Sequence, residues 1–435
     1  MFSAFQHGPG FSGPSHAPQS PSTAWAFLAE YAQAIRGCDG EAICQLLRTG
    51  DAWSLSNQDL LGAIKTVPEQ QFSRNMKQQV KDNALQSLLL TYVTFLRHWT
   101  AGVTDQTTFD NTVKVVGVLT TCFSSSERYW LSETVKRWTS YMVRLARQVD
   151  YASVNPTKHA CVNQAAQLVA RLFNMALNDR APLPESRAVA MFHLVNLNLR
   201  IYFWLRTTRL CHSMLSHVNR SGLDLTLFPK SEQVTYRYFA GRSFLFQHRI
   251  HDAERELARA LAECTLQPSA FRNRRTIFFH LVIARVILGK APHPALLEKY
   301  GYQELFGPVI TAIRQGWIWK FEQHCEQIQD ALLPTASYLL LRERCQVLLY
   351  RNLFRRVFLI TRPQVSQKVS FVKLEDMLHA ARLSTQDADL DLDDVECLLA
   401  SMISQGYVRG NINLQRKLVV LSKRDPFPPP HTLNK

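Results

Sequence analysis

The stretch DLDDVECLLASMISQGYVRGNINLQRKLVVL, residues 391 to 421, decides the fold because it contains a change from helix to strand. Its first part, Asp391 to Gln405, opens with aspartates that complement the positive start of a helix, and Gly406 ends that helix. Two extended runs follow, Tyr407 to Ile412 and Leu418 to Leu421, with a short turn between them. This pattern predicts a helix followed by a two-stranded hairpin.

Two further helices are predicted before this stretch. The apolar spacing from about Thr335 to Ile360 predicts a long helix, and Ser370 to Leu378 is expected to form a short one. Helix, helix, helix and hairpin is the order of a winged-helix domain, which we place at residues 346 to 425. The tail from Pro426 to Lys435 contains four prolines and is expected to end the fold.

The segment from Val234 to Leu261 has a pattern that predicts packed helical pairs. Along the roughly 34-residue repeat of tetratricopeptide arrays, five residues fall where small, aromatic, small, large and small side chains are required. These residues are Gly241, Phe244, Ala253, Leu257 and Ala260. Small side chains let two helices approach closely, and the larger ones fill the space between them. One such unit cannot bury its own faces, so the pattern implies a stack of neighbouring pairs.

The rest of the chain is expected to be helical, except for its beginning. Residues 1 to 23 are rich in Gly, Pro and Ser and are expected to be disordered. We therefore predict an all-α protein in which TPR-like helical-hairpin repeats form a superhelix and run into a C-terminal winged-helix domain. Its expected parts are a disordered start (1–23), N-terminal helical repeats (24–220), a second helical part (221–345), the winged helix (346–425) and a proline-rich tail (426–435).

Composition indicates a basic, intracellular, globular protein. Lysine and arginine number 50 against 35 acidic residues, a net charge of +15. This charge favours polyanionic partners such as nucleic acid, although a face that docks an acidic protein would have the same composition. The nine cysteines form no C-x-x-C pair, so neither disulfides nor a zinc cluster is expected. The chain lacks an apolar run long enough for a membrane span and the features of a secretion signal, so we expect no membrane association.

The sequence contains none of the common catalytic or nucleotide-binding patterns that we searched for. His248 and His251 are spaced like part of a metal site, but no nearby cysteine completes it. We therefore expect no enzyme activity, no cofactor and no metal.

Basic residues toward the C-terminus are candidate binding residues. Arg351 and Arg355 lie one turn apart in a predicted helix, and they are consistent both with a polyanion groove and with an intramolecular clamp on the winged helix. Arg416 and Lys417 at the tip of the hairpin are well placed to contact phosphates. The other basic residues of the hairpin are Arg409, Lys423 and Arg424.

Two other charge clusters bear on this surface. Arg272, Arg274 and Arg275 crowd a helix start, where positive charge opposes the helix dipole, and form either a solvated turn or a functional cluster. Near the C-terminus an acidic block precedes and opens the predicted recognition helix. It consists of Asp387, Asp389, Asp391, Asp393, Asp394 and Glu396. Because such a face repels DNA, sequence-specific base recognition is disfavoured.

Several stretches of the chain resemble one protein family. They are Tyr238-Phe239-Ala240-Gly241-Arg242, Asn273-Arg274-Arg275 with Leu288-Gly289, Tyr350 to Val357, and Leu418 to Lys423 with Pro426 to Pro429. In these stretches, and in the layout of helical repeats that run directly into a winged helix, the chain resembles the PCI-domain family. Within that family it resembles the branch of the fungal COP9 signalosome subunit twelve and PCI-domain-containing protein 2. The resemblance covers roughly residues 200 to 430, and the preceding helices more loosely.

The resemblance implies a non-enzymatic scaffold subunit that pairs with another PCI protein through winged-helix contacts. That partner is either an mRNA-export scaffold or a signalosome subunit, and a small acidic peptide shared with the proteasome lid is a further implied partner. The resemblance also implies transcription-coupled mRNA export, a location in the nucleus, at nuclear pores and in the cytoplasm, and a basic surface for RNA or DNA without sequence specificity. Carried over by position, the nucleic-acid-binding candidates are Arg351, Arg355, Arg356, Arg409, Arg416 and Lys417. The alternative is a purely protein-binding subunit of a COP9 signalosome-type complex without nucleic-acid contact.

Overall fold

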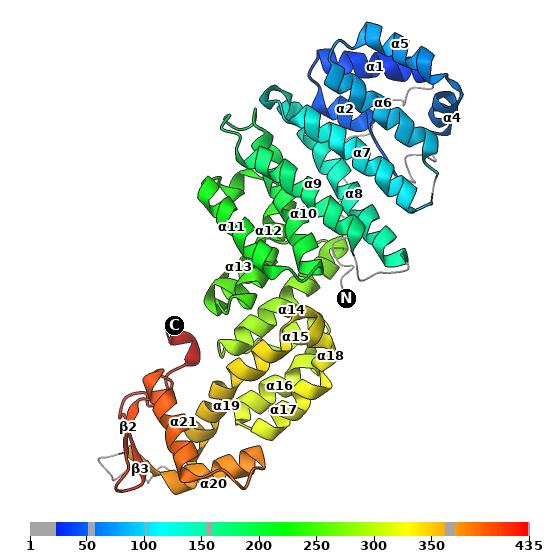
Figure 1. The fold of residues 1–435 in the computed structure, drawn as a ribbon. Helices are drawn as coiled ribbons and strands as arrows, with labels where there is room; N and C mark the ends of the chain where they lie inside the picture. Colours follow the sequence, from blue (N-terminus) through cyan, green and yellow to red (C-terminus); the bar gives the residue numbers. More distant parts are fainter. Residues whose placement is uncertain (1–22, 51–56, 101, 154–158, 362–369, 434–435) are drawn as a thin grey trace. The chain divides into compact units, whose positions relative to one another are not determined.

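The computed structural model describes residues 23–50, 57–100, 102–153, 159–361 and 370–433, which fold as helices with one small sheet near the C-terminus (Figure 1). The prediction of an all-α fold of helical repeats that ends in a winged helix is confirmed. The segment expected to be disordered lies, apart from Thr23, outside the described residues. No helix in the described ranges combines the length and the apolar character that a membrane span requires.

The chain divides into two compact units, and the division falls inside α12 (Lys230–Phe246), between Phe239 and Ala240. The described helices of the N-terminal unit before α12 are α1 (Ala24–Arg36), α2 (Gly40–Leu46), α4 (Gln58–Thr66), α5 (Glu69–Gln79), α6 (Asn83–His98), α7 (Gln106–Phe123), α8 (Ser132–Ala152), α9 (Ala160–Leu177), α10 (Met191–Trp204) and α11 (Thr208–Ser221). The domain boundaries expected after residues 220 and 345 stay predictions.

An aromatic cluster holds the first helices of this unit together. The buried ring of Trp138 on α8 packs edge-on against Tyr92 and Phe95 of α6, with ring centroids 5.9 and 5.3 Å away. The polar atoms of the cluster are satisfied as well, since the Trp138 indole donates to the carbonyl of Leu47 (2.9 Å) and the Tyr92 hydroxyl to that of Arg48 (2.7 Å). Buried aromatic area and satisfied donors together fix the end of α2 against α6 and α8.

The C-terminal unit begins within α12 and consists of helices followed by a mixed module of helices and strands. Its helices are α13 (Ile250–Glu263), α14 (Phe271–Ile287), α15 (Pro294–Lys299), α16 (Gln303–Gln315), α17 (Ile318–Gln327), α18 (Gln329–Leu332), α19 (Tyr338–Thr361), α20 (Leu374–Thr385) and α21 (Leu392–Ser404). Its strands are β1 (Ser370–Lys373), β2 (Gly410–Asn413) and β3 (Leu418–Leu421).

The residues of the predicted repeat pattern lie where α12 and α13 meet. A Cβ atom at Gly241 would stand 2.6 Å from Cγ of Leu257 and 3.3 Å from the carbonyl oxygen of Ala253, so only glycine allows this approach. Ala253, Leu257 and Ala260 are fully buried. Phe244 is half-buried, and the Arg249 guanidinium covers its ring at 4.6 Å.

Arg274 has a structural role in this unit. Its Nη1 donates to the carbonyls of Cys264 (2.7 Å) and Leu261 (3.3 Å) at the end of α13, and its Nε donates to the Tyr300 hydroxyl (3.2 Å). It thus satisfies helix-end carbonyls that have no partner within their own helix. Arg275 instead lies over the ring of Tyr302 at 5.0 Å, and Arg272 is exposed.

The winged helix differs from its prediction at one strand. Ser370 to Lys373 was expected to begin a short helix, but it forms β1, and α20 begins only at Leu374. β1 pairs antiparallel with β3, Phe371 opposite Val420, so the two-stranded hairpin becomes a three-stranded sheet of order β1-β3-β2. Four residues are too few to show a period, and the pairing partner lies far along the sequence, so only the folded chain reveals this strand.

Replacing Gly241 by alanine tests the close contact between α12 and α13. We expect the free energy of unfolding to fall by about 1–3 kcal/mol, because the added methyl group overlaps Leu257. Gly117→Ala in α7 is the matched control, since no atom lies within 4 Å of its Cβ position, and we expect a gain of up to about 1 kcal/mol there. Urea unfolding measures both; equal effects at the two sites would contradict the packing argument.

Candidate nucleic-acid interface

The turn between α16 and α17 joins the helical part of the C-terminal unit to α19. Gly316 has φ +67°, and a Cβ atom there would lie 2.6 Å from the backbone nitrogen of Leu353. The Asn352 amide donates to the carbonyl of Ile313 (2.7 Å), and Nη1 of Arg356 donates to that of Gln315 (2.7 Å). Both the conformation and the space therefore require glycine at this turn.

The same turn also holds α20 of the winged helix. The buried hydroxyl of Ser384 on α20 donates to the carbonyl of Gly316 (2.6 Å) and accepts a hydrogen bond from the backbone N–H of Ile318 (3.0 Å). The helices α16, α17, α19 and α20 therefore meet at one turn. Because each of these polar groups is paired, the winged helix is held in a fixed position on the helices before it.

Arg351 clamps the C-terminal tail. Only 8% of the residue is exposed, and its Nη2 donates to the carbonyls of Phe427 (2.6 Å) and Pro428 (3.0 Å). Burial, helped by the nearby charge of Arg355, lowers the pKa of Arg351 to about 10, so the group stays charged at neutral pH. Of the two roles considered for Arg351, the structure shows the intramolecular clamp, and its guanidinium is buried rather than presented to a ligand.

The tail itself packs on the fold, which corrects the expectation that the fold ends before Pro426. Phe427 is 5% exposed and its ring lies 6.0 Å from that of Phe358 on α19. The carbonyl of Pro426 accepts the backbone N–H of Arg409 (2.8 Å). The tail therefore connects α19 to the base of the hairpin. Prolines have no N–H to leave unpaired, and their restricted backbone reduces the entropy lost on docking.

The hairpin presents its basic tip on a well-defined turn. The Asn413 side chain accepts the backbone N–H of Arg416 (3.0 Å), and Lys417, in the left-handed region at φ +49°, donates its N–H to Leu414 (3.2 Å). The side chains of Arg416 and Lys417 are exposed, and neither forms an ion pair with any described residue. Two unneutralised charges on a hydrogen-bonded turn suit contact with phosphates.

The other candidates gather at the opposite end of the hairpin. Arg409 forms an ion pair with Asp425 (3.6 Å), and both side chains are about half exposed. The charge of Asp425 also acts on Arg351, so Arg351, Arg355 and Arg409 lie in one region around this carboxylate. Arg355 is exposed, whereas Arg356 is exposed but already donates to Gln315. The cations at the hairpin tip therefore form no ion pair with described residues, whereas Arg409 at the base of the hairpin is partly neutralised by Asp425.

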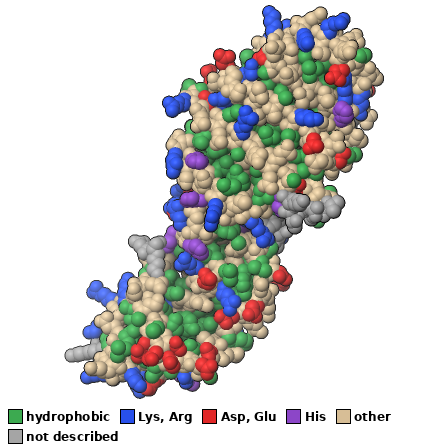
Figure 2. All heavy atoms as spheres, viewed as in Figure 1, with side chains coloured by type: hydrophobic (Ala, Val, Ile, Leu, Met, Phe, Trp, Pro, Cys, Tyr) green, Lys and Arg blue, Asp and Glu red, His purple; other side chains and the backbone are tan. Residues whose placement is uncertain are grey.

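The acidic block covers a different part of the winged helix. Asp391 and Asp394 form a reciprocal capping box at the start of α21, with bonds of 2.9 and 3.0 Å. The acidic residues from Asp387 to Asp394 are exposed, and Figure 2 shows acidic side chains gathered over α20 and α21. An acidic helix start repels phosphates, so α21 is poorly suited to reading bases in a groove.

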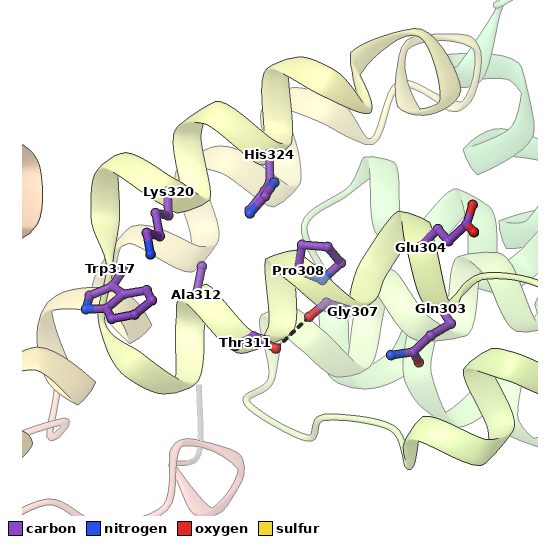
Figure 3. Close-up of a pocket in the computed structure, with 9 residues that line it drawn as sticks. All are labelled: Gln303, Glu304, Gly307, Pro308, Thr311, Ala312, Trp317, Lys320 and His324. Carbon is purple, nitrogen blue, oxygen red and sulfur yellow. Dashed lines mark hydrogen bonds between the residues drawn. The ribbon is translucent and has the colours of Figure 1, made fainter.

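A hollow of about 430 Å³ lies between α16 and α17 (Figure 3). The Lys320 ammonium lies over the Trp317 ring at 3.6 Å, and the Thr311 hydroxyl donates to the carbonyl of Gly307 (2.9 Å) rather than to a base. His324 contacts Gln327 at 3.2 Å. These side chains do not form the pairing of nucleophile and base that acyl transfer requires.

His248 and His251, which were spaced like part of a metal site, are both exposed. The neighbouring Asp252 forms ion pairs with Arg249 and Arg255. Among the residues that the structure describes, no three His, Cys, Asp or Glu side chains are grouped to hold a metal ion.

Comparison with known proteins identifies one domain and several relatives that match over most of the chain. The PCI domain matches residues 321–423, which include α19 and the winged helix. A PCI domain-containing protein of Schizosaccharomyces pombe is 36% identical over 353 residues, covering 78% of this chain and 78% of that protein.

Two other relatives match over shorter spans. PCI domain-containing protein 2 of Xenopus laevis is 28% identical, and the alignment covers 62% of this chain and 65% of that protein. The protein CSN12 homolog of Neurospora crassa is 32% identical, and the alignment covers 61% of each. The chain therefore spans slightly less than two thirds of these two proteins.

Replacing Arg351 by methionine tests the clamp. We expect the free energy of unfolding to fall by about 2 kcal/mol, because the carbonyls of Phe427 and Pro428 lose a charged donor. Arg355→Met removes an exposed charge one turn away and is expected to change stability by less than about 0.5 kcal/mol. Urea unfolding measures both, and hydrogen exchange at the Arg409 amide should accelerate only in the first variant. Equal stability of the two would show that the clamp does not hold the tail.

Proposed function

Because the chain belongs to the family of PCI domain-containing proteins, we propose that it is a non-catalytic scaffold subunit that pairs with another PCI protein and offers the basic tip of its winged helix to RNA or DNA. The resemblance found in the sequence is confirmed by these relatives. Transcription-coupled mRNA export, with the protein in the nucleus, at nuclear pores and in the cytoplasm, is the proposed setting. A small acidic peptide is a proposed further partner.

The hairpin tip is the observation that carries the nucleic-acid proposal. Arg416 and Lys417 are exposed and unneutralised by described carboxylates, and the hairpin that presents them is held by the tail and by the pairing of β3 with β1. A fixed pair of cations binds a polyanion with less loss of side-chain and loop entropy than a mobile pair. The acidic start of α21 favours contact with the phosphate backbone of the nucleic acid over recognition of its bases.

The outer face of the sheet supports pairing with a second PCI protein. Phe371 and Val420 stand directly opposite each other on β1 and β3, and each is 36% exposed. Both β1 and β2 are edge strands of the described sheet. Exposed apolar cross-strand pairs beside an open edge favour a protein partner that covers them.

This same face also supports the alternative, in which the chain binds only proteins within a signalosome-type complex. An acidic block over α20 and α21 and an apolar sheet face are sufficient for protein contacts, without any nucleic acid. At the level of the winged helix, the two proposals differ in what the basic tip contacts.

Neutralising the basic surface separates the two proposals. The wing variant is Arg355→Gln, Arg416→Gln and Lys417→Gln in the full chain with its PCI partner. Loss of three phosphate contacts is expected to reduce the slope of log affinity against log salt by about 2 for a single-stranded oligonucleotide, measured by gel shift. The control variant, Lys65→Gln, Arg74→Gln and Lys77→Gln, removes as much charge from exposed positions on α4 and α5.

If the wing and control variants bind alike, the tip is not the interface. Absence of binding by the unmodified chain, with the PCI partner retained, would favour the purely protein-binding alternative.

Introducing charge into the sheet face tests the pairing. Phe371→Asp with Val420→Asp is expected to weaken association with the PCI partner at least about tenfold, because two carboxylates would have to be desolvated in the interface. Leu266→Asp changes an 80% exposed residue outside the sheet and serves as control. Co-purification and titration calorimetry measure the effect, and unchanged affinity would place the partner elsewhere.

A further inference from the structure

Helix α11 in the N-terminal unit has a basic face that the winged-helix proposal does not use. Arg209 and Arg220 are about three helical turns apart and therefore lie nearly in line along the helix. The buried face consists of Cys211, Met214, Leu215 and Val218. We define the α11 surface by exposed basic side chains, which are Arg206 just before the helix and Arg209, His212, His217 and Arg220 on it.

No acidic side chain of the surrounding sequence neutralises this surface. Residues 186 to 223 contain neither Asp nor Glu, and Arg206, Arg209 and Arg220 form no ion pair with any residue in the described ranges. Figure 2 shows Lys, Arg and His side chains where α11 lies. On α13, by contrast, the exposed Arg255 pairs with Asp252.

An aromatic side chain lies at the end of this charged line. Trp204, the last residue of α10, precedes Arg206 by two positions. Its half-buried ring lies 4.7 Å from the ring of His159 and 5.8 Å from the guanidinium carbon of Arg147. Cations in a row with an aromatic group at one end are what proteins use to follow a single polynucleotide strand.

We infer that the α11 surface is a second nucleic-acid contact, and that it binds a single strand along its backbone. The charges follow one helix, which matches one phosphate backbone rather than two. Among the described residues of α11, Leu210 is the one large apolar side chain that is exposed (49%), so the surface offers a protein partner a single aliphatic residue and no aromatic cluster. This inference depends on residues of the N-terminal unit alone and does not require the wing to bind.

The α11 variant Arg206→Gln, Arg209→Gln and Arg220→Gln in the full chain tests this inference. With labelled oligouridylate or oligothymidylate, we expect the slope of log affinity against log salt to fall by about 2 and the affinity at low salt to fall at least about tenfold. The triple change at Lys65, Arg74 and Lys77 is again the matched control, with the same loss of charge in the same unit. Ultraviolet crosslinking followed by peptide mapping should label the segment around Trp204 in the unmodified chain and in the wing variant.

The outcomes separate this inference from the proposed function. If only the α11 variant loses oligonucleotide affinity, α11 is the binding site and the hairpin tip is not. If only the wing variant loses it, the inference about the α11 surface is wrong and the hairpin tip is the binding site. Losses in both support two contacts. If polyglutamate binds in place of the oligonucleotide, and the α11 variant loses only polyglutamate, the surface holds an acidic protein and the inference is wrong.

Discussion

The contact between Gly316 and the backbone of Leu353 is the constraint on which the C-terminal unit depends. A positive φ and the absence of a Cβ atom allow the turn between α16 and α17 to touch α19 directly. At that distance the Asn352 and Arg356 side chains reach the carbonyls of the turn, and Ser384 reaches them from α20. One backbone approach therefore sets the position of the winged helix on the helical part.

Arginines in this unit divide into those that hold the fold and those that face solvent. Arg274 satisfies the end of α13, and Arg351 satisfies two carbonyls of the tail. A guanidinium suits both tasks because its several donors can reach two carbonyls at once. The net charge of +15 therefore overstates the charge available to a ligand. The hairpin tip and the α11 surface are two places where exposed cations form no ion pair with described residues.

In the winged helix, acidic and basic side chains lie on different elements. Aspartates at the start of α21 cap that helix, so part of the acidic block has a structural cause. The hairpin carries the opposite charge at its tip, and an apolar pair, Phe371 and Val420, lies on the sheet behind it. A module arranged in this way can contact a polyanion with one side and a protein with another, which is what the proposed scaffold role requires.

The sequence by itself determined the order of the helices around the wing and the identity of the wing, because helix periodicity, the aspartates at 391 to 394 and the short β-branched apolar run at Leu418 to Leu421 are local signals. The glycine and alanine spacing from Gly241 to Ala260 is also a local signal, because Gly241 and the residues it contacts lie on two consecutive helices, α12 and α13. Only the tertiary structure decided the strand at Ser370, the docking of the proline tail and the roles of Arg351 and Arg355. Each of these depends on contacts with residues far away in the chain, such as Arg351 with Phe427, and no local pattern records which of two neighbouring arginines becomes buried.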